Sequence, residues 1–388
     1  MKLRNMSPVA TLSAAFRSSA CIGMVIAMSI TGASGAQAIS PSAQPRPGGS
    51  CTKAGDTFTV PGRGTLTCKK VKGKLVWTTP ADASGATSAA SCQVPKGLTR
   101  STVRPIGTRA PAFLLSPDEH SYGSAAAIKA KGFNAINTSV LIPYNAQGEL
   151  DFTRYGGKDA WLCSLSSQIG ALKKAGLEVL IEGELQAVDN PRGVEPGPVP
   201  EGIRATIAQK VTELMPDLAK MLEQNKVEYF APLGESEKWI GVDLTQSAYP
   251  TWVSITKQSY NGKVFAQLFT GVPGQQAFGP LGITPNLTGL DALGSVFGDW
   301  SCSANSLAYT DAYVAAAKAQ SVGTILLSEL GGVTIPADTA AAQACMVSIV
   351  ERYGARNTGV LFMDNSKSMP GAQSVEGSWP ETLLLSLK

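Results

Sequence analysis

The sequence of 388 residues contains a single histidine, His120. Zinc sites built from several imidazoles are therefore excluded, and a Ser-His-Asp triad could form only through His120. Proton transfer at an active site would then have to use carboxylates, tyrosine, lysine or cysteine. We predict neither a metal site nor a cofactor site.

Long apolar runs are also scarce. The apolar run at residues 21–30 is too short to cross a membrane as an ordinary helix. It follows a stretch with three basic residues and precedes Ala36-Gln37-Ala38, an arrangement typical of a secretory signal peptide. We therefore expect residues 1–38 to be removed and the mature protein to be secreted or cell-wall-associated, without a stable membrane span.

A strong excess of positive charge is missing as well. The formal net charge of +4 falls to +1 when Lys2, Arg4 and Arg17 leave with the signal peptide. A nucleic-acid-binding domain would carry a basic stripe or patch over its surface. Nucleic acid is therefore not an expected partner. We also expect the protein to be a monomer.

The cysteines remain even in number after the signal peptide is removed. Loss of Cys21 leaves six of the seven, which is typical of disulfide pairing in an oxidising compartment. Cys51 and Cys68 lie in one short segment, and we predict that they are joined. The other four allow three connectivities, among which the sequence does not choose: Cys92, Cys163, Cys302 and Cys345.

A small module is predicted at residues 51–77, between linkers at 39–50 and 78–91. Short alternating runs of Thr, Val, Leu and Phe indicate two or three antiparallel strands that a disulfide would stabilise. The module is basic, and its charged groups either bind an anionic cell wall or form a solvated face. Six basic residues oppose Asp56: Lys53, Arg63, Lys69, Lys70, Lys72 and Lys74.

From residue 92 to residue 388, strand-like runs alternate with helical patterns. Eight strands over this length predict an α/β fold, a (β/α)8 TIM barrel. An open doubly wound sheet would instead be expected to carry a glycine-rich phosphate loop after the first strand, and the sequence has none there. The predicted strands are Ala112–Leu115, Asn134–Ile142, Glu178–Ile181, Val227–Leu233, Val264–Phe269, Leu290–Phe297, Gly323–Ser328 and Gly359–Met363.

Two acidic residues follow two of these apolar runs. Glu235 follows the fourth predicted strand and Glu329 the seventh. Catalytic side chains of such barrels collect at the carboxyl ends of the strands. Two carboxylates that meet there could cleave a glycosidic bond, one as acid/base and one as nucleophile.

At these two strands the chain resembles the clan A glycoside hydrolases. The resemblance covers the barrel and is strongest at Leu-Leu-Ser-Glu329-Leu-Gly-Gly. It implies a retaining glycosidase that acts on a polysaccharide or oligosaccharide, with Glu235 as acid/base and Glu329 as nucleophile. Glu237 could take the place of Glu235, and a wide gap between the carboxyl groups would indicate inversion.

The chain departs from the clan pattern at several positions. Gly234 replaces the usual asparagine before the acid/base, and the arginine common on the second strand is missing. The eighth predicted strand ends in Phe362 and Met363 instead of tryptophan. These departures leave open a non-catalytic carbohydrate-binding barrel. A further alternative is a cell-wall-associated structural protein that is anchored through the basic module.

Further residues near the predicted strand ends are candidates for binding the substrate. Glu182 and Glu184 follow the third predicted strand, and Glu182 could also substitute as a catalyst. Aromatic side chains could stack on sugar rings. The residues predicted to bind substrate are Glu182, Trp239, Asp299, Trp300 and Tyr144.

Overall fold

The computed structural model describes most of the chain between Ser50 and Lys388. The described residues are 50–60, 64–71, 73–78, 94–111, 113–114, 117, 120–189, 198–269, 277–332, 335–336, 339–353, 357–364 and 374–388. The predicted signal peptide and nearly all of both predicted linkers lie outside them. The chain divides into two compact units, of which one holds a small sheet and the other a barrel.

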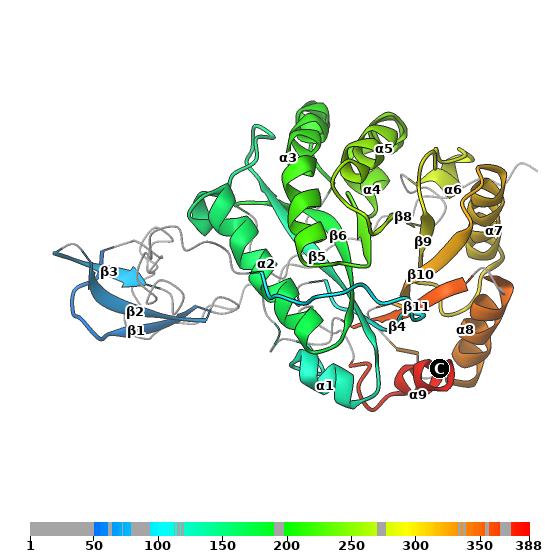
Figure 1. Ribbon diagram of the computed structural model, residues 1–388, viewed down its shortest axis with the longest axis horizontal. Helices are drawn as coiled ribbons and strands as arrows, with labels where there is room; N and C mark the ends of the chain where they lie inside the picture. Colours follow the sequence, from blue (N-terminus) through cyan, green and yellow to red (C-terminus); the bar gives the residue numbers. More distant parts are fainter. Residues whose placement is uncertain are drawn as a thin grey trace, which may run out of the picture. The chain divides into compact units, whose positions relative to one another are not determined.

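The small unit is a three-stranded sheet in the order β1-β2-β3 (Figure 1), with β1 at Thr57–Val60, β2 at Gly64–Val71 and β3 at Lys74–Thr78. β2 and β3 pair antiparallel, and Gly73 takes a positive φ of 84° in the turn between them. The disulfide Cys51–Cys68 closes the unit and buries the Cys68 side chain. The predicted disulfide and the predicted antiparallel module are confirmed.

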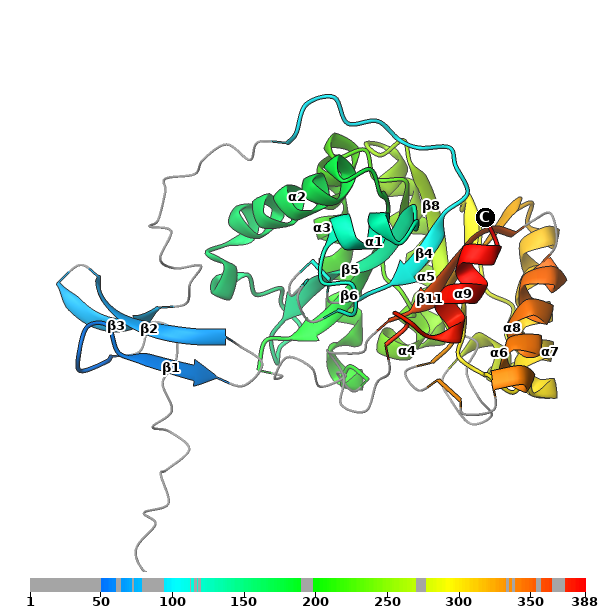
Figure 2. The same ribbon diagram turned by 90° about the horizontal axis from the view of Figure 1, so that it is seen from below.

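The large unit is a closed barrel of eight parallel strands, and helices surround it (Figure 1 and Figure 2). This confirms the predicted TIM barrel. The strands are β4 (Ile106–Arg109), β5 (Ala135–Tyr144), β6 (Glu178–Ala187), β7 (Tyr229–Ala231), β8 (Lys263–Phe269), β9 (Ala292–Phe297), β10 (Thr324–Leu330) and β11 (Asn357–Met363).

Helical segments connect these strands along the chain. None of the helices in the described part is long and apolar enough to cross a membrane. The helices are α1 (Ala125–Ala130), α2 (Lys158–Lys174), α3 (Arg204–Gln224), α4 (Ser236–Ile240), α5 (Val242–Lys257), α6 (Phe278–Leu281), α7 (Ala304–Ala319), α8 (Thr339–Tyr353) and α9 (Trp379–Ser386), with short 3-10 turns η3 (Thr153–Tyr155) and η4 (Glu201–Ile203).

The prediction of the first strand was wrong. The strand lies at Ile106–Arg109, before the apolar run Ala112–Leu115, whose described residues Phe113 and Leu114 pack into the core from a turn. The sequence Ile-Gly-Thr-Arg lacks an apolar pattern because its interior-facing residues are Gly107 and Arg109. A Cβ atom on Gly107 would lie 1.8 Å from the carbonyl oxygen of Ala135 on β5.

The barrel interior has an apolar layer of side chains and, nearer the carboxyl ends of the strands, a polar layer. The apolar layer consists of eight buried side chains that pack on one another. On four of the strands, a buried polar residue follows two positions after the residue of the apolar layer. Residues two apart on a strand face the same side. These polar residues are Asn137, Glu182, Gln267 and Ser328. The apolar layer is Ala135, Leu180, Tyr229, Ala231, Phe265, Ala292, Leu326 and Leu361.

Buried charges lie at the opposite end of the barrel as well. Glu228 accepts hydrogen bonds from the backbone N–H groups of Val179 (2.8 Å) and Ser101 (2.9 Å) and forms an ion pair with Lys173. Glu178, at the start of β6, accepts a hydrogen bond from the Ser101 hydroxyl (2.7 Å). These contacts attach the segment before β4 to the amino-terminal end of the barrel.

A second disulfide, Cys302–Cys345, joins the segment after β9 to α8. It removes two of the three pairings that the sequence left open. Cys163 on α2 is also disulfide-bonded. Cys92 lies outside the described residues.

Substitution of Gly107 tests the position of β4. Because the added Cβ would meet the backbone of β5, Gly107→Ala should lower the free energy of unfolding by about 3 kcal/mol or more. Urea denaturation of the purified chain measures this. Gly202→Ala is the matched control, since a Cβ there meets no atom within 4 Å. Equal stability of the two variants would contradict the observed pairing of β4 with β5.

Candidate active site

Glu235 and Glu329 lie at the carboxyl ends of the strands. Counted from β4, the strand before Glu235 (β7) is the fourth of the barrel and the strand that carries Glu329 (β10) is the seventh. The predicted strand numbers are therefore correct. Each carboxylate needs a particular backbone feature to reach its position.

Glu329 faces the barrel interior because of an irregularity in β10. The pairing of β10 with β9 shifts by one residue between Leu326 and Glu329, and the pairing with β11 shifts between Leu327 and Leu330. A β-bulge of this kind changes the direction of the side chains that follow it. The Glu329 Oε2 atom thereby lies 3.1 Å from Nε of Arg109.

Glu235 adopts a left-handed backbone conformation, with φ 47° and ψ 38°. Such a conformation is uncommon for a residue other than glycine and occurs often at functional sites. The Glu235 N–H donates a hydrogen bond to the carbonyl oxygen of Gln267 on β8 (2.8 Å), which fixes the turn before α4. Its side chain is 16% exposed, and its Oε2 atom lies 3.7 Å from Nζ of Lys238.

Arg109, the last residue of β4, contacts three carboxylates. Its Nη2 atom lies 2.9 Å from Glu182 and 2.5 Å from Glu184, while its Nε atom faces Glu329. Its side chain is only 3% exposed, so the guanidinium is surrounded mainly by these carboxylates and has little contact with water. The sequence interpretation missed Arg109 because it sought an arginine on the second strand. A polar residue that ends a glycine-containing strand would have been the signal.

The four carboxylates differ in exposure. Glu184 is 20% exposed and accepts a hydrogen bond from the Ser139 hydroxyl (2.6 Å). Glu182 has no exposed surface. Glu235 and Glu329 are partly exposed, at 16% and 11% of the side chain. Three of the four therefore have surface that a substrate could contact.

The pKa of Glu329 is raised to about 7. Burial is the largest cause, and the negative charges of Glu235 and Glu184 raise this pKa further. The positive charges of Arg109 and Lys238 oppose the shift. The carboxylates of Glu235 and Glu329 therefore interact electrostatically across one site.

Glu237 occupies a different position from Glu235. Its side chain is buried on α4, and Oε1 accepts a hydrogen bond from the N–H of Phe269 (2.7 Å). Burial raises its pKa to about 8. Of the two carboxylates after β7, Glu235 is the one that the structure leaves accessible.

Trp300 lies beside the strand that carries Glu329. A Cβ atom on Gly331 would lie 2.5 Å from the Trp300 ring, so the indole packs against the backbone just beyond β10. Trp300, Phe362 and Trp379 form an aromatic cluster with ring centroids 5.3–6.4 Å apart. Trp300 and Trp379 are both half-buried, which leaves part of the cluster accessible.

Three other predicted substrate-binding residues have local partners. The Trp239 indole is 5% exposed and donates to the carbonyl oxygen of Gly234 (3.1 Å). Tyr144 is 5% exposed and belongs to the hydrophobic core. Asp299 accepts hydrogen bonds from the Ser301 hydroxyl (2.5 Å) and from the N–H groups of Ser301 and Ser303 (2.9 and 2.8 Å), and hydrogen bonds from these two serines hold its pKa well below the usual range. A role of these three in substrate binding stays a prediction.

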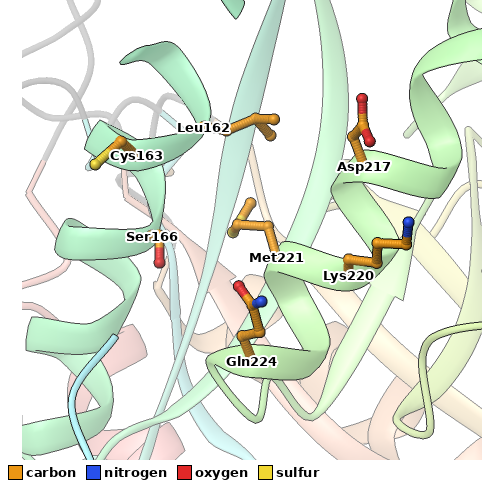
Figure 3. A pocket seen from close by; sticks show the side chains of 7 residues that line it. All are labelled: Leu162, Cys163, Ser166, Asp217, Lys220, Met221 and Gln224. Atoms are coloured by element: carbon orange, nitrogen blue, oxygen red, sulfur yellow. The ribbon is translucent and has the colours of Figure 1, made fainter. Parts of the chain in front are cut away.

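A separate cavity of about 150 Å³ lies on the outside of the barrel, between α2 and α3 (Figure 3). It contains no residue of the strand ends. The residues that line the cavity are Leu162, Cys163, Ser166, Asp217, Lys220, Met221 and Gln224.

Among the described residues, no group of three His, Cys, Asp or Glu side chains could hold a metal ion.

Solved structures with the same barrel include a mannanase and an endo-glycoceramidase. A GH113 beta-1,4-mannanase matches with a TM-score of 0.52 and 12% sequence identity, over 73% of this chain and 98% of that chain. Endo-glycoceramidase II from Rhodococcus sp. matches with a TM-score of 0.51 and 13% identity, over 75% of this chain and 81% of that chain. No protein-family model and no curated protein matches the chain. At these identities the likeness is one of fold, and it agrees with the predicted fold.

Glu237 should make stability fall as the pH rises. Its pKa in the folded chain, about 8, lies above its ordinary value of 4.5. Between these values the unfolded chain releases the proton while the folded chain keeps it, so the free energy of unfolding decreases. Glu237→Gln removes this loss, and its stability relative to the wild type should increase from about pH 5 to about pH 8, by about 1.4 kcal/mol for each unit of the shift.

Urea denaturation at several pH values measures the difference. The matched control is Glu351→Gln, which changes an exposed carboxyl on α8. A constant difference between Glu237→Gln and wild type across this pH range would show that Glu237 ionises normally in the folded chain.

Proposed function

We propose that the chain is a secreted glycoside hydrolase that cleaves a polysaccharide or oligosaccharide by a two-glutamate retaining mechanism. The observation that carries this proposal is the placement of Glu235 and Glu329 after the fourth and on the seventh strand of one barrel, electrostatically coupled and both partly exposed. The names of the two similar structures, a beta-1,4-mannanase and an endo-glycoceramidase, agree with carbohydrate as the substrate.

In this mechanism Glu329 is the nucleophile. Its ionised carboxylate attacks the anomeric carbon while protonated Glu235 gives its proton to the departing glycosidic oxygen, which leaves a glycosyl–enzyme ester. Glu235, now ionised, then takes a proton from water, and the water attacks the same carbon and releases Glu329. Arg109, whose Nε atom faces Glu329, favours the ionised form of that carboxyl group. Retention requires the two carboxyl groups to lie roughly 5–5.5 Å apart.

Two accessible features suit a sugar ring. Glu184 presents a carboxylate that Arg109 and Ser139 hold in place, and carboxylates accept hydrogen bonds from hydroxyl groups. The half-buried Trp300 packs on Gly331 just beyond the strand that carries Glu329, Trp379 packs on Trp300, and both offer aromatic surface. We propose that these residues bind the sugar that is cleaved.

Removal of the nucleophile tests the reaction. Glu329→Gln keeps the shape of the side chain, and we expect turnover to fall by several orders of magnitude while the fold is retained. Reducing-sugar release from a panel of polysaccharides measures turnover, and circular dichroism measures the fold. The control Glu351→Gln should match the wild type.

Full activity in Glu329→Gln would remove the retaining mechanism. If the wild type binds a polysaccharide on the panel but releases no sugar from any of them, the chain is a non-catalytic carbohydrate-binding barrel.

We further propose that the amino-terminal unit attaches the protein to an anionic cell wall. Four lysines in the described part of this unit are exposed. The acidic residue in the same part is Asp56. Exposed positive charges attract a polyanion at a strength that falls with salt. The lysines are Lys53, Lys69, Lys70 and Lys74.

Neutralising this surface should weaken attachment. We expect the triple variant Lys69→Gln, Lys70→Gln, Lys74→Gln to co-sediment less with purified anionic cell wall, with the larger difference at low salt. Activity on small soluble substrates should not change. The control carries Lys174→Gln, Lys220→Gln and Lys318→Gln, which are exposed on barrel helices. Equal loss of binding in both triple variants would show that attachment depends on the net charge of the protein and not on the lysines of this unit.

A further inference from the structure

Glu182 is buried among the groups of the candidate active site. It has no exposed surface, and both of its carboxylate oxygens accept hydrogen bonds, Oε2 from Nη2 of Arg109 (2.9 Å) and Oε1 from Nδ2 of Asn137. A carboxylate without exposed surface does not contact a substrate in this conformation. Its effect on a reaction would have to pass through its neighbours.

One path from Glu182 leads to the Glu329 side chain. Arg109 bonds Glu182 through Nη2 and faces Glu329 through Nε. Because the guanidinium is planar and rigid, fixing one nitrogen fixes the direction of the others. Glu182 therefore helps to hold the cation that holds Glu329.

A second path leads to the Glu329 backbone. The Asn137 Nδ2 atom donates to Glu182 and also to the carbonyl oxygen of Ser328 (3.0 Å). Ser328 lies in the β-bulge that turns Glu329 toward the barrel interior. Glu182 thus determines the orientation of the amide that contacts this bulge.

A third path leads to Glu235. A Cβ atom on Gly234 would lie 2.9 Å from the Glu182 Oε2 atom and 3.4 Å from its Cβ atom. The N–H of Gly234 also donates to the carbonyl oxygen of Gly183 (2.8 Å). The turn that presents Glu235 therefore packs directly on Glu182, and this contact explains why residue 234 is a glycine.

We propose that Glu182 is a positioning residue that fixes Glu329 and Glu235 relative to each other, through Arg109, Asn137 and Gly234. The inference rests on the proposed function for its catalytic consequence. The contacts themselves do not depend on it. A residue in this role should change the rate of the chemical step more than the affinity for substrate.

Glu178 provides the matched control. It lies on the same strand, is also buried, and accepts its hydrogen bond from Ser101 at the other end of the barrel. If the wild type is active, Glu182→Gln should lower kcat about 10- to 100-fold with little change in KM, because small displacements of reacting groups have effects of this size. Glu178→Gln, with kcat expressed per folded molecule, should match the wild type.

A second readout requires no substrate. The charged and titratable groups around Glu182 are Arg109 on β4, Glu184 on β6, Glu329 on β10 and Tyr249 on α5. The pKa of Glu182 is raised to about 8, mainly by burial, and the charges of Glu184 and Glu329 also raise it while Arg109 lowers it. In Glu329→Gln the titration midpoint of Glu182 should therefore fall, because a neighbouring negative charge is removed.

Nuclear magnetic resonance of chains labelled with ¹³C at the glutamate carboxyl measures this midpoint, and loss of the signal in Glu182→Asp, which keeps a carboxylate at this position, assigns it. In Glu178→Gln the midpoint of Glu182 should not move. An unchanged midpoint in Glu329→Gln would overturn the proposal, even if Glu182→Gln fails to fold. An unchanged kcat in folded Glu182→Gln would overturn it as well. A shifted midpoint without turnover of any polysaccharide by the wild type would reject the glycosidase and retain the coupling of Glu182 with Glu329.

Discussion

The buried guanidinium of Arg109 is the interaction on which the candidate active site depends. Three carboxylates lie within about hydrogen-bond distance of it, and a buried charge is costly unless it is paired. Without this cation, the like charges of Glu182, Glu184 and Glu329 would repel one another in a region with little water. Burial raises the pKa values of Glu182 and Glu329 by more than Arg109 lowers them, and the neighbouring carboxylates raise them as well.

This arrangement follows from the periodicity of the strands. Side chains two residues apart on a strand face the same side, so the apolar layer and the polar layer come from the same strands, at Leu180 and Glu182 for example. The apolar layer closes the interior below the carboxylates, which keeps water out from that side. Arg109 ends β4 two residues after Gly107 and so belongs to the same set of interior-facing positions.

Much of the fold could be predicted from the sequence, because most strands are apolar runs between recognisable helices. Seven of the eight strands and the placement of Glu235 and Glu329 follow from that alternation. The first strand could not be found this way, since two of its four residues are Gly107, which lies close to the backbone of β5, and Arg109, which carries a charge. The apolar residues Phe113 and Leu114 gave a stronger signal although they lie in a turn.

The candidate site was less predictable than the fold, because its contacts connect residues far apart in the chain. Gly234 was interpreted as a departure from the clan pattern, whereas the structure gives it a local cause, the side chain of Glu182. The β-bulge at Glu329 and the burial of Glu182 depend on neighbouring strands, and no pattern within one strand reveals them. Sequence reasoning therefore found the acidic residues but not which of them are accessible.

Two glutamates of β6 show how the same residue type serves different purposes in one barrel. Glu178 and Glu182 both lie on β6, and both are buried. Burial raises the pKa of each carboxyl group. Glu178 bonds a hydroxyl of the chain segment that closes the amino-terminal end, where contacts stabilise the fold. Glu182 shares its cation with two carboxylates that are partly exposed, Glu184 and Glu329, so it is linked to groups that a substrate can contact. Burial alone therefore does not distinguish a structural carboxylate from a functional one. The distinction lies in whether its partner is also bound to an accessible group.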